Sequence, residues 1–102
     1  MSIFHMFYDR QGNPIEFLQL AELLEDPNVH RVSKNTFKDG SWLSTVFTGM
    51  QLYEDRLRIF ETMFFPSAGS PETIGRWDTE EEAYTEHAKA LQQLLAQGYS
   101  SL

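Results

Sequence analysis

Two apolar stretches that lie close together in the chain constrain most strongly what this sequence can fold into. They are Trp42-Leu-Ser-Thr-Val-Phe-Thr-Gly49 and Leu57-Arg-Ile-Phe-Glu-Thr-Met-Phe-Phe65. Both are rich in β-branched and aromatic residues, which favour a pleated strand over a helix. The segment between them, 50–56, has the composition of a loop. We therefore expect two adjacent antiparallel strands at the centre of a small sheet.

Three further segments have strand patterns. They are the apolar run 3–8, the alternating segment 29–37 and the short segment 73–77. An Asp-Gly pair at Asp39-Gly40 separates the second of these from the first central strand, which is a strong hairpin signal.

Two segments have helical periodicity. The first begins near Asn13-Pro14 and ends before Pro27, because a residue that precedes proline disfavours the α region. The second begins at Thr79, which fits a capping box with Glu82, and ends at Gly98. The sequence therefore predicts one α+β domain over residues 1–102. We expect an antiparallel sheet of four to five strands, in the order strand-helix-strand-strand-strand-strand-helix, with the two helices packed on one face.

Composition argues against several classes of protein. The chain has no cysteine, which excludes disulfides and thiolate metal sites. No apolar run approaches the roughly 20 residues of a membrane-spanning helix. The first residues lack the basic flank and long apolar region of a signal peptide, so we expect a cytoplasmic protein. The net charge of −7 repels phosphate backbones, so we expect no nucleic-acid partner.

The charges are unevenly distributed along the chain. Glutamates cluster at the start of the last predicted helix, at Glu80, Glu81, Glu82 and Glu86. Six cations lie in or beside predicted strands: Arg31, Lys34, Lys38, Arg56, Arg58 and Arg76. A locally basic sheet surface beneath an acidic helix is compatible with this pattern.

Three motifs resemble those of a known family. Trp42 to Gly49 is similar to W-x-S-T-V-[WF]-x-G, and Ile59-Phe-Glu-Thr-Met-Phe64 is similar to I/L-F-E-T-M-V-F. Arg76-Trp-Asp-Thr-Glu-Glu-Glu-Ala83 with His87 is similar to R-Y-x-T-x-E-E-A-x-x-x-H. These patterns belong to a family of small proteins of bacteriophages and bacteria, whose opening also resembles segment 7–15. The chain departs from the pattern at 49–55, where the family continues with a Leu-Asp-His segment and a Gly/Pro-rich loop. The resemblance implies a phage or prophage setting and no particular reaction.

Four polar residues are candidates for a ligand site: Arg58, Glu61, Arg76 and His87. Glu61 lies in the most apolar strand, where a carboxylate is costly unless it is paired or solvated, and either arginine is a candidate partner. His87 lies on the apolar side of the last helix, where it is either a packed, hydrogen-bonded residue or the contact of a sheet carboxylate or ligand. Glu61 and His87 would form a proton-transfer pair if they met.

The sequence shows no nucleophile, phosphate-binding or metal-binding motif. No Gly-x-Ser-x-Gly, P-loop or dinucleotide-binding pattern is present. The three histidines, His5, His30 and His87, are far apart and outside any metal-ligand spacing. We therefore expect no enzymatic activity, no metal and no cofactor.

Five aromatic residues are candidates for an exposed interaction surface: Trp42, Phe47, Phe60, Phe64 and Trp77. Strand alternation places some of them on the face opposite the helices, and exposed aromatic residues mark contact surfaces. The leading hypothesis is a small, acidic, phage-related accessory protein that occupies a host protein, as an anti-defence inhibitor would, and that forms a homodimer. The alternative is a binder or sponge for a small anionic ligand, such as a nucleotide, near the four polar residues.

Overall fold

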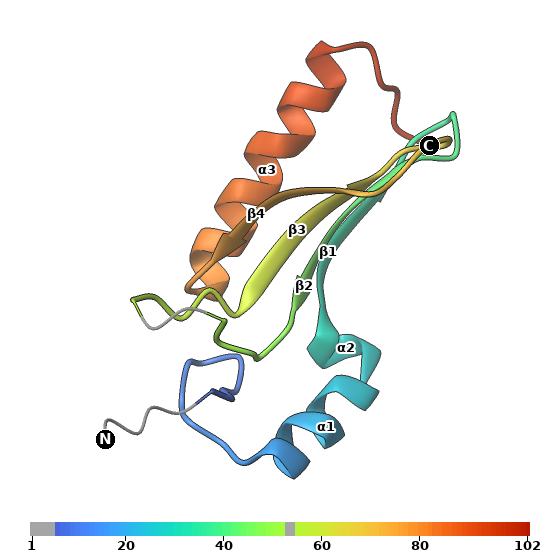
Figure 1. The fold of residues 1–102 in the computed structure, drawn as a ribbon. Helices are drawn as coiled ribbons and strands as arrows, with labels where there is room; N and C mark the ends of the chain where they lie inside the picture. The colour runs from blue at the N-terminus through green and yellow to red at the C-terminus, as the bar shows by residue number, and fades with distance from the viewer. Residues whose placement is uncertain (1–5, 53–54) are drawn as a thin grey trace.

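The computed structural model describes residues 6–52 and 55–102, and its central feature is one four-stranded antiparallel sheet (Figure 1). The strands are β1 (Arg31–Thr36), β2 (Trp42–Phe47), β3 (Phe60–Phe65) and β4 (Glu72–Trp77), and they lie side by side in that order. The predicted α+β class and the antiparallel sheet are confirmed.

The two central strands pair as the sequence predicts. Trp42 lies opposite Phe65, and Thr45 lies opposite Thr62. β3 begins at residue 60 rather than 57, because Arg58 has a positive φ of 49° and interrupts the extended backbone. The backbone N–H groups at positions 48 and 49 both donate to the carbonyl of Ile59, so regular pairing ends there.

Three helices accompany the sheet: α1 (Phe17–Glu25), α2 (Pro27–His30) and α3 (Glu80–Ala96). α3 lies along one face of the sheet and contacts all four strands, whereas α1 and α2 lie at one end of it (Figure 1). The short helix α2 was not predicted. Asp26 caps it by accepting a hydrogen bond from the Asn28 N–H, and Pro27 is its first residue. β1 therefore begins at Arg31 rather than at residue 29.

Of the predicted first strand, 3–8, the described residues 6–8 do not form a fifth strand of the sheet. Residues 3–5 lie outside the described part of the chain. Phe7 and Tyr8 make only isolated bridges, with Met50 and Pro14 respectively. The segment is held instead by single contacts, including a buried hydrogen bond from the Tyr8 hydroxyl to Gln51.

The start of α3 matches the predicted capping pattern. The Thr79 hydroxyl accepts a hydrogen bond from the Glu82 N–H at 3.1 Å. The Glu82 carboxylate accepts from the N–H of Asp78, one residue earlier than a standard capping box. Gly98 has a φ of +108° and follows the helix as its C-terminal stop. No helix in the described part of the chain combines the length and apolar composition needed to cross a bilayer.

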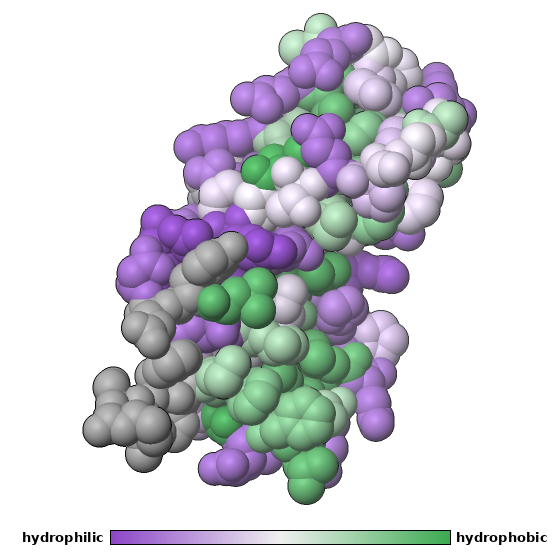
Figure 2. Space-filling model, viewed as in Figure 1, coloured by the Kyte–Doolittle hydropathy of each residue, from purple (hydrophilic) through white to green (hydrophobic). Residues whose placement is uncertain are grey.

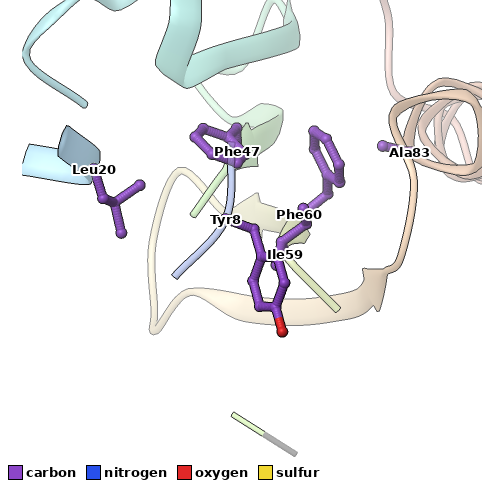
Figure 3. Packing of buried hydrophobic residues seen from close by; sticks show 6 residues of the cluster. All are labelled: Tyr8, Leu20, Phe47, Ile59, Phe60 and Ala83. Atoms are coloured by element: carbon purple, nitrogen blue, oxygen red, sulfur yellow. The ribbon is translucent and has the colours of Figure 1, made fainter. Parts of the chain in front are cut away.

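The core lies between the sheet and α3 and has two apolar clusters. The larger contains Tyr8, Leu20, Phe47, Ile59, Phe60 and Ala83 (Figure 3). The smaller contains Phe37, Leu43, Phe64 and Ala90. Leu20 of α1 and Ala83 of α3 belong to one cluster, so α1 contributes to the core from the end of the sheet, whereas α3 contributes along its face (Figure 1).

Candidate functional site

Five polar side chains form a continuous hydrogen-bonded row between the two apolar clusters, which we call the buried polar chain. The Trp77 indole N–H donates to the Thr62 hydroxyl at 2.9 Å, and that hydroxyl lies 2.5 Å from the Thr45 hydroxyl. Thr45 lies 2.7 Å from Nδ1 of His87, and Nε2 of His87 lies 2.7 Å from Oδ1 of Asn35. His87 lies one helical turn from each of Ala83 and Ala90, so α3 presents it between the two clusters.

The partners of the buried polar chain define one tautomer of His87. An amide oxygen only accepts, so Nε2 carries the proton and donates it to Asn35. Nδ1 then accepts from Thr45, whose only hydroxyl proton is thereby used, and Thr62 must donate to Thr45. Trp77, which can only donate, starts the row, so all donors point the same way. A protonated imidazole would reverse the Thr45 hydroxyl and leave the Thr62 proton without an acceptor in the row.

The pKa of His87 is lowered, because burial disfavours the charged imidazolium. The side chain is only 4% exposed, and its two neighbours in the row are neutral groups. His87 is therefore a neutral, structural histidine, which is the first of the two interpretations that its position in the sequence allowed.

We expect the stability of the protein to fall as the pH drops below the ordinary histidine pKa of 6.5. The unfolded chain takes up this proton at a higher pH than the folded chain does, so stability is lost between the unfolded pKa and the lowered folded pKa, with a slope of at most about 1.36 kcal/mol per pH unit. Urea denaturation between pH 7.5 and pH 5 measures this slope. The variant His87→Gln should show a shallower slope, and an unchanged slope would contradict the assignment.

Asp78 also makes the stability of the protein depend on pH, but at a lower pH than His87 does. Burial raises the pKa of Asp78, but hydrogen bonds from the Arg56 side chain and the Arg58 N–H outweigh burial, and the net pKa lies below its ordinary value of 3.8. The stability that Asp78 contributes is complete above 3.8 and is lost as the pH falls through the lowered pKa. It does not change the expected slope between pH 7.5 and pH 5.

The opposite face of the sheet, which we call the outer face, is not covered by any helix of the described residues (Figure 1). Burial alternates along the central strands: Leu43, Thr45 and Phe47 are buried toward α3, and the residues between them are half-buried. Register and alternation assign these residues to the outer face: Arg31, Lys34, Thr36, Trp42, Ser44, Val46, Glu61, Met63, Phe65, Thr73 and Arg76.

An aromatic row crosses one end of the outer face. The rings of Trp42 and Phe65 are stacked, with centroids 4.8 Å apart and planes 12° apart. The ammonium of Lys34 lies 5.3 Å from the centroid of the Trp42 ring. Lys34 and Phe65 come from the strands on either side of β2, so neighbours on both adjacent strands contact Trp42 in the row Lys34–Trp42–Phe65.

The four residues predicted to bind a ligand do not form one site. Glu61 and Arg76 pair at 2.7 Å on the outer face, where they are opposite each other on β3 and β4. His87 lies in the core on the other side of the sheet, so it does not meet Glu61. Arg58 lies in the segment before β3, where its backbone N–H bonds to Asp78. The predicted site between sheet and helices is therefore wrong as a group of four, because alternation separates Glu61 from His87.

The predicted interaction surface is also corrected in part. Phe47, Phe60 and Phe64 are buried in the core, so they are not available for contact. Trp77 is half-buried and belongs to the buried polar chain. Trp42 alone of the five lies on the outer face.

Several residues of the outer face and of the buried polar chain were not predicted as site residues from the sequence. Phe65 and Lys34 were not assigned to the contact surface, although strand alternation puts Phe65 on the same side as Glu61. Asn35 gave no signal of its own, because a polar residue in an alternating strand is usually a solvated one. Only the register of β1 against β2 shows that it faces the core.

A second apolar region lies at the opposite end of the molecule from the end of α3. Figure 2 shows apolar side chains gathered around the segment that contains α1. The exposed large apolar residues of this region are Met6, Phe17, Leu18, Met50 and Leu52. Met6 and Leu52 adjoin residues 1–5 and 53–54, which lie outside the described part of the chain.

The described residues do not contain a cluster of three or more His, Asp or Glu side chains that could hold a metal ion. A scan against protein-family models, a search of curated proteins and a search of solved structures each gave no match.

Proposed function

We propose that this chain is a small, non-enzymatic binding protein that acts by occupying another protein through the outer face of its sheet. One observation carries the proposal: the outer face bears a pre-positioned aromatic row, and no helix in the described part of the chain crosses it. Trp42, Met63 and Phe65 are half-buried there, and apolar side chains rimmed by polar residues are characteristic of protein contact surfaces. Stacked, laterally packed rings lose little conformational freedom on binding, which favours affinity.

The motif resemblance supports a phage or prophage setting, with a host protein in the bacterial cytoplasm as the partner. Many of the motif residues belong to the buried polar chain or the core, where packing accounts for them. Others lie on the outer face, where no helix packs on them: Trp42, Ser44, Val46, Glu61, Met63 and Arg76. We propose that these residues serve the contact, and that inhibition of an antiviral defence protein is one form that this contact takes.

The test is affinity capture from a bacterial lysate with three forms of the chain. The wild type is compared with the outer-face variant Trp42→Ser/Phe65→Ser and with the control Phe17→Ser/Leu18→Ser. The control changes α1 residues that are 59% and 73% exposed, so it removes exposed apolar side chains at another place on the surface. Circular dichroism establishes that each form is folded.

We expect one host protein to be retained by the wild type and the control and lost by the outer-face variant. Titration of that purified protein should then show at least tenfold weaker binding for the outer-face variant. Retention by the outer-face variant, or loss only in the control, would contradict the proposal.

A second copy of the chain is the alternative partner for the outer face, because a homodimer would also cover the aromatic row. Light scattering at micromolar concentration distinguishes it. A mass of two chains that falls to one chain in Trp42→Ser/Phe65→Ser would assign the face to a dimer and overturn the host-protein proposal.

A further inference from the structure

The outer face has a charge opposite to that of the whole chain. It carries three cations, Arg31, Lys34 and Arg76, and one carboxylate, Glu61, which is already paired with Arg76. The net charge of the chain is −7, so the acidic groups lie elsewhere, with a cluster in the first turn of α3 on the other side of the sheet. Arg31 and Lys34 are both exposed on the edge strand β1.

The Trp42 ring beside these cations already has two partners. Phe65 stacks on the ring, and the Lys34 ammonium lies 5.3 Å from its centroid. A nucleobase binds a sheet mainly by stacking on an open aromatic face, so this arrangement disfavours single-stranded nucleic acid. Ring edges and the neighbouring Met63 instead offer a surface for aliphatic side chains.

We propose that the outer face binds an acidic segment of its protein partner, with apolar side chains against Trp42, Met63 and Phe65 and carboxylates over Arg31 and Lys34. This inference rests on the proposed function and names the chemistry of its partner. A second copy of the chain fits less well, because it would place a face of three cations and one carboxylate against an identical face. The acidic groups of α3 do not prevent the contact, since salt screens charges more than about 8–10 Å away.

The test uses three labelled probes and fluorescence anisotropy. The probes are a peptide of alternating glutamate and leucine, a peptide of alternating lysine and leucine, and an oligothymidylate of the same length. We expect the glutamate peptide to bind, and its affinity to fall at least tenfold in Arg31→Glu/Lys34→Glu and to weaken in high salt. The control Lys38→Glu/Lys89→Glu makes the same change in charge outside the outer-face strands and should bind as the wild type does.

Three outcomes would overturn the inference: equal binding of the lysine peptide, tighter binding of the oligothymidylate, or no binding of the glutamate peptide at millimolar concentration. None of these affects the lysate capture described above. Face-dependent capture without binding of the glutamate peptide would therefore leave the proposed function in place and reject only the acidic partner.

Discussion

Replacement of His87 by alanine is expected to lower the free energy of unfolding by about 3 kcal/mol. The imidazole fills space between the two apolar clusters and satisfies Thr45 on one side and Asn35 on the other. Its removal leaves a cavity and takes away a partner from two polar groups, one of which, Thr45, is fully buried. A loss of this size is a large part of the roughly 5–15 kcal/mol that stabilises a typical domain.

Chemical denaturation measures this loss, with Gln92→Ala as the control. Gln92 is exposed on α3, so its replacement should change stability by less than about 0.5 kcal/mol. A double-mutant cycle with Thr45→Val isolates the hydrogen bond, and we expect a coupling energy of about 1 kcal/mol or more. A loss below about 1 kcal/mol for His87→Ala would show that the buried polar chain is not formed.

Replacement of Gly49 by alanine is expected to cost about 2–4 kcal/mol, the second large effect. Gly49 has a φ of +69°, which disfavours any side chain, and a Cβ there would lie 2.3 Å from the Leu20 side chain and 3.0 Å from the Tyr8 carbonyl oxygen. The close approach is what lets the N-terminal segment and α1 close the larger apolar cluster. The added methyl group must displace one of them.

The matched control for this change is Gly40→Ala. Gly40 has a similarly positive φ of +91°, but a Cβ there meets no atom within 4 Å. It therefore carries the backbone strain without the collision, and we expect a loss of about 1–2 kcal/mol. Thermal denaturation compares the two variants. Equal losses would mean that the approach of Leu20 and Tyr8 to Gly49 contributes nothing.

The sequence predicted the architecture well because periodicity reports local structure directly. The alternation of residues 42–47 and 60–65 and the capped helix that begins after Thr79 were sufficient to place the central strands and α3. The packing of His87 against the sheet was also predicted, because the residue shares a helix face with Ala83 and Ala90. The short helix α2 was missed, since four residues after a proline have no period to detect.

The site residues were predicted less well from the sequence. The face of the sheet on which a strand residue lies depends on the pairing register of the strands. Alternation shows that Phe60 and Phe64 share a side of their strand, but it does not show which side α3 covers. The register Trp42–Phe65 and the contacts of α3 decide that Phe47, Phe60 and Phe64 face the core. The same register separates Glu61 from His87, so a proton-transfer pair that composition allowed does not exist.

Site-specific photo-crosslinking in a bacterial host reports which face of the protein contacts a partner. A photoreactive phenylalanine analogue is placed at position 44, in the middle of the outer face between Lys34 and Met63, or at position 88, which is exposed on α3. We expect irradiation to join the chain to one host protein from position 44 and not from position 88. Crosslinks from position 88 alone, or to a second copy of the chain from position 44, would contradict it.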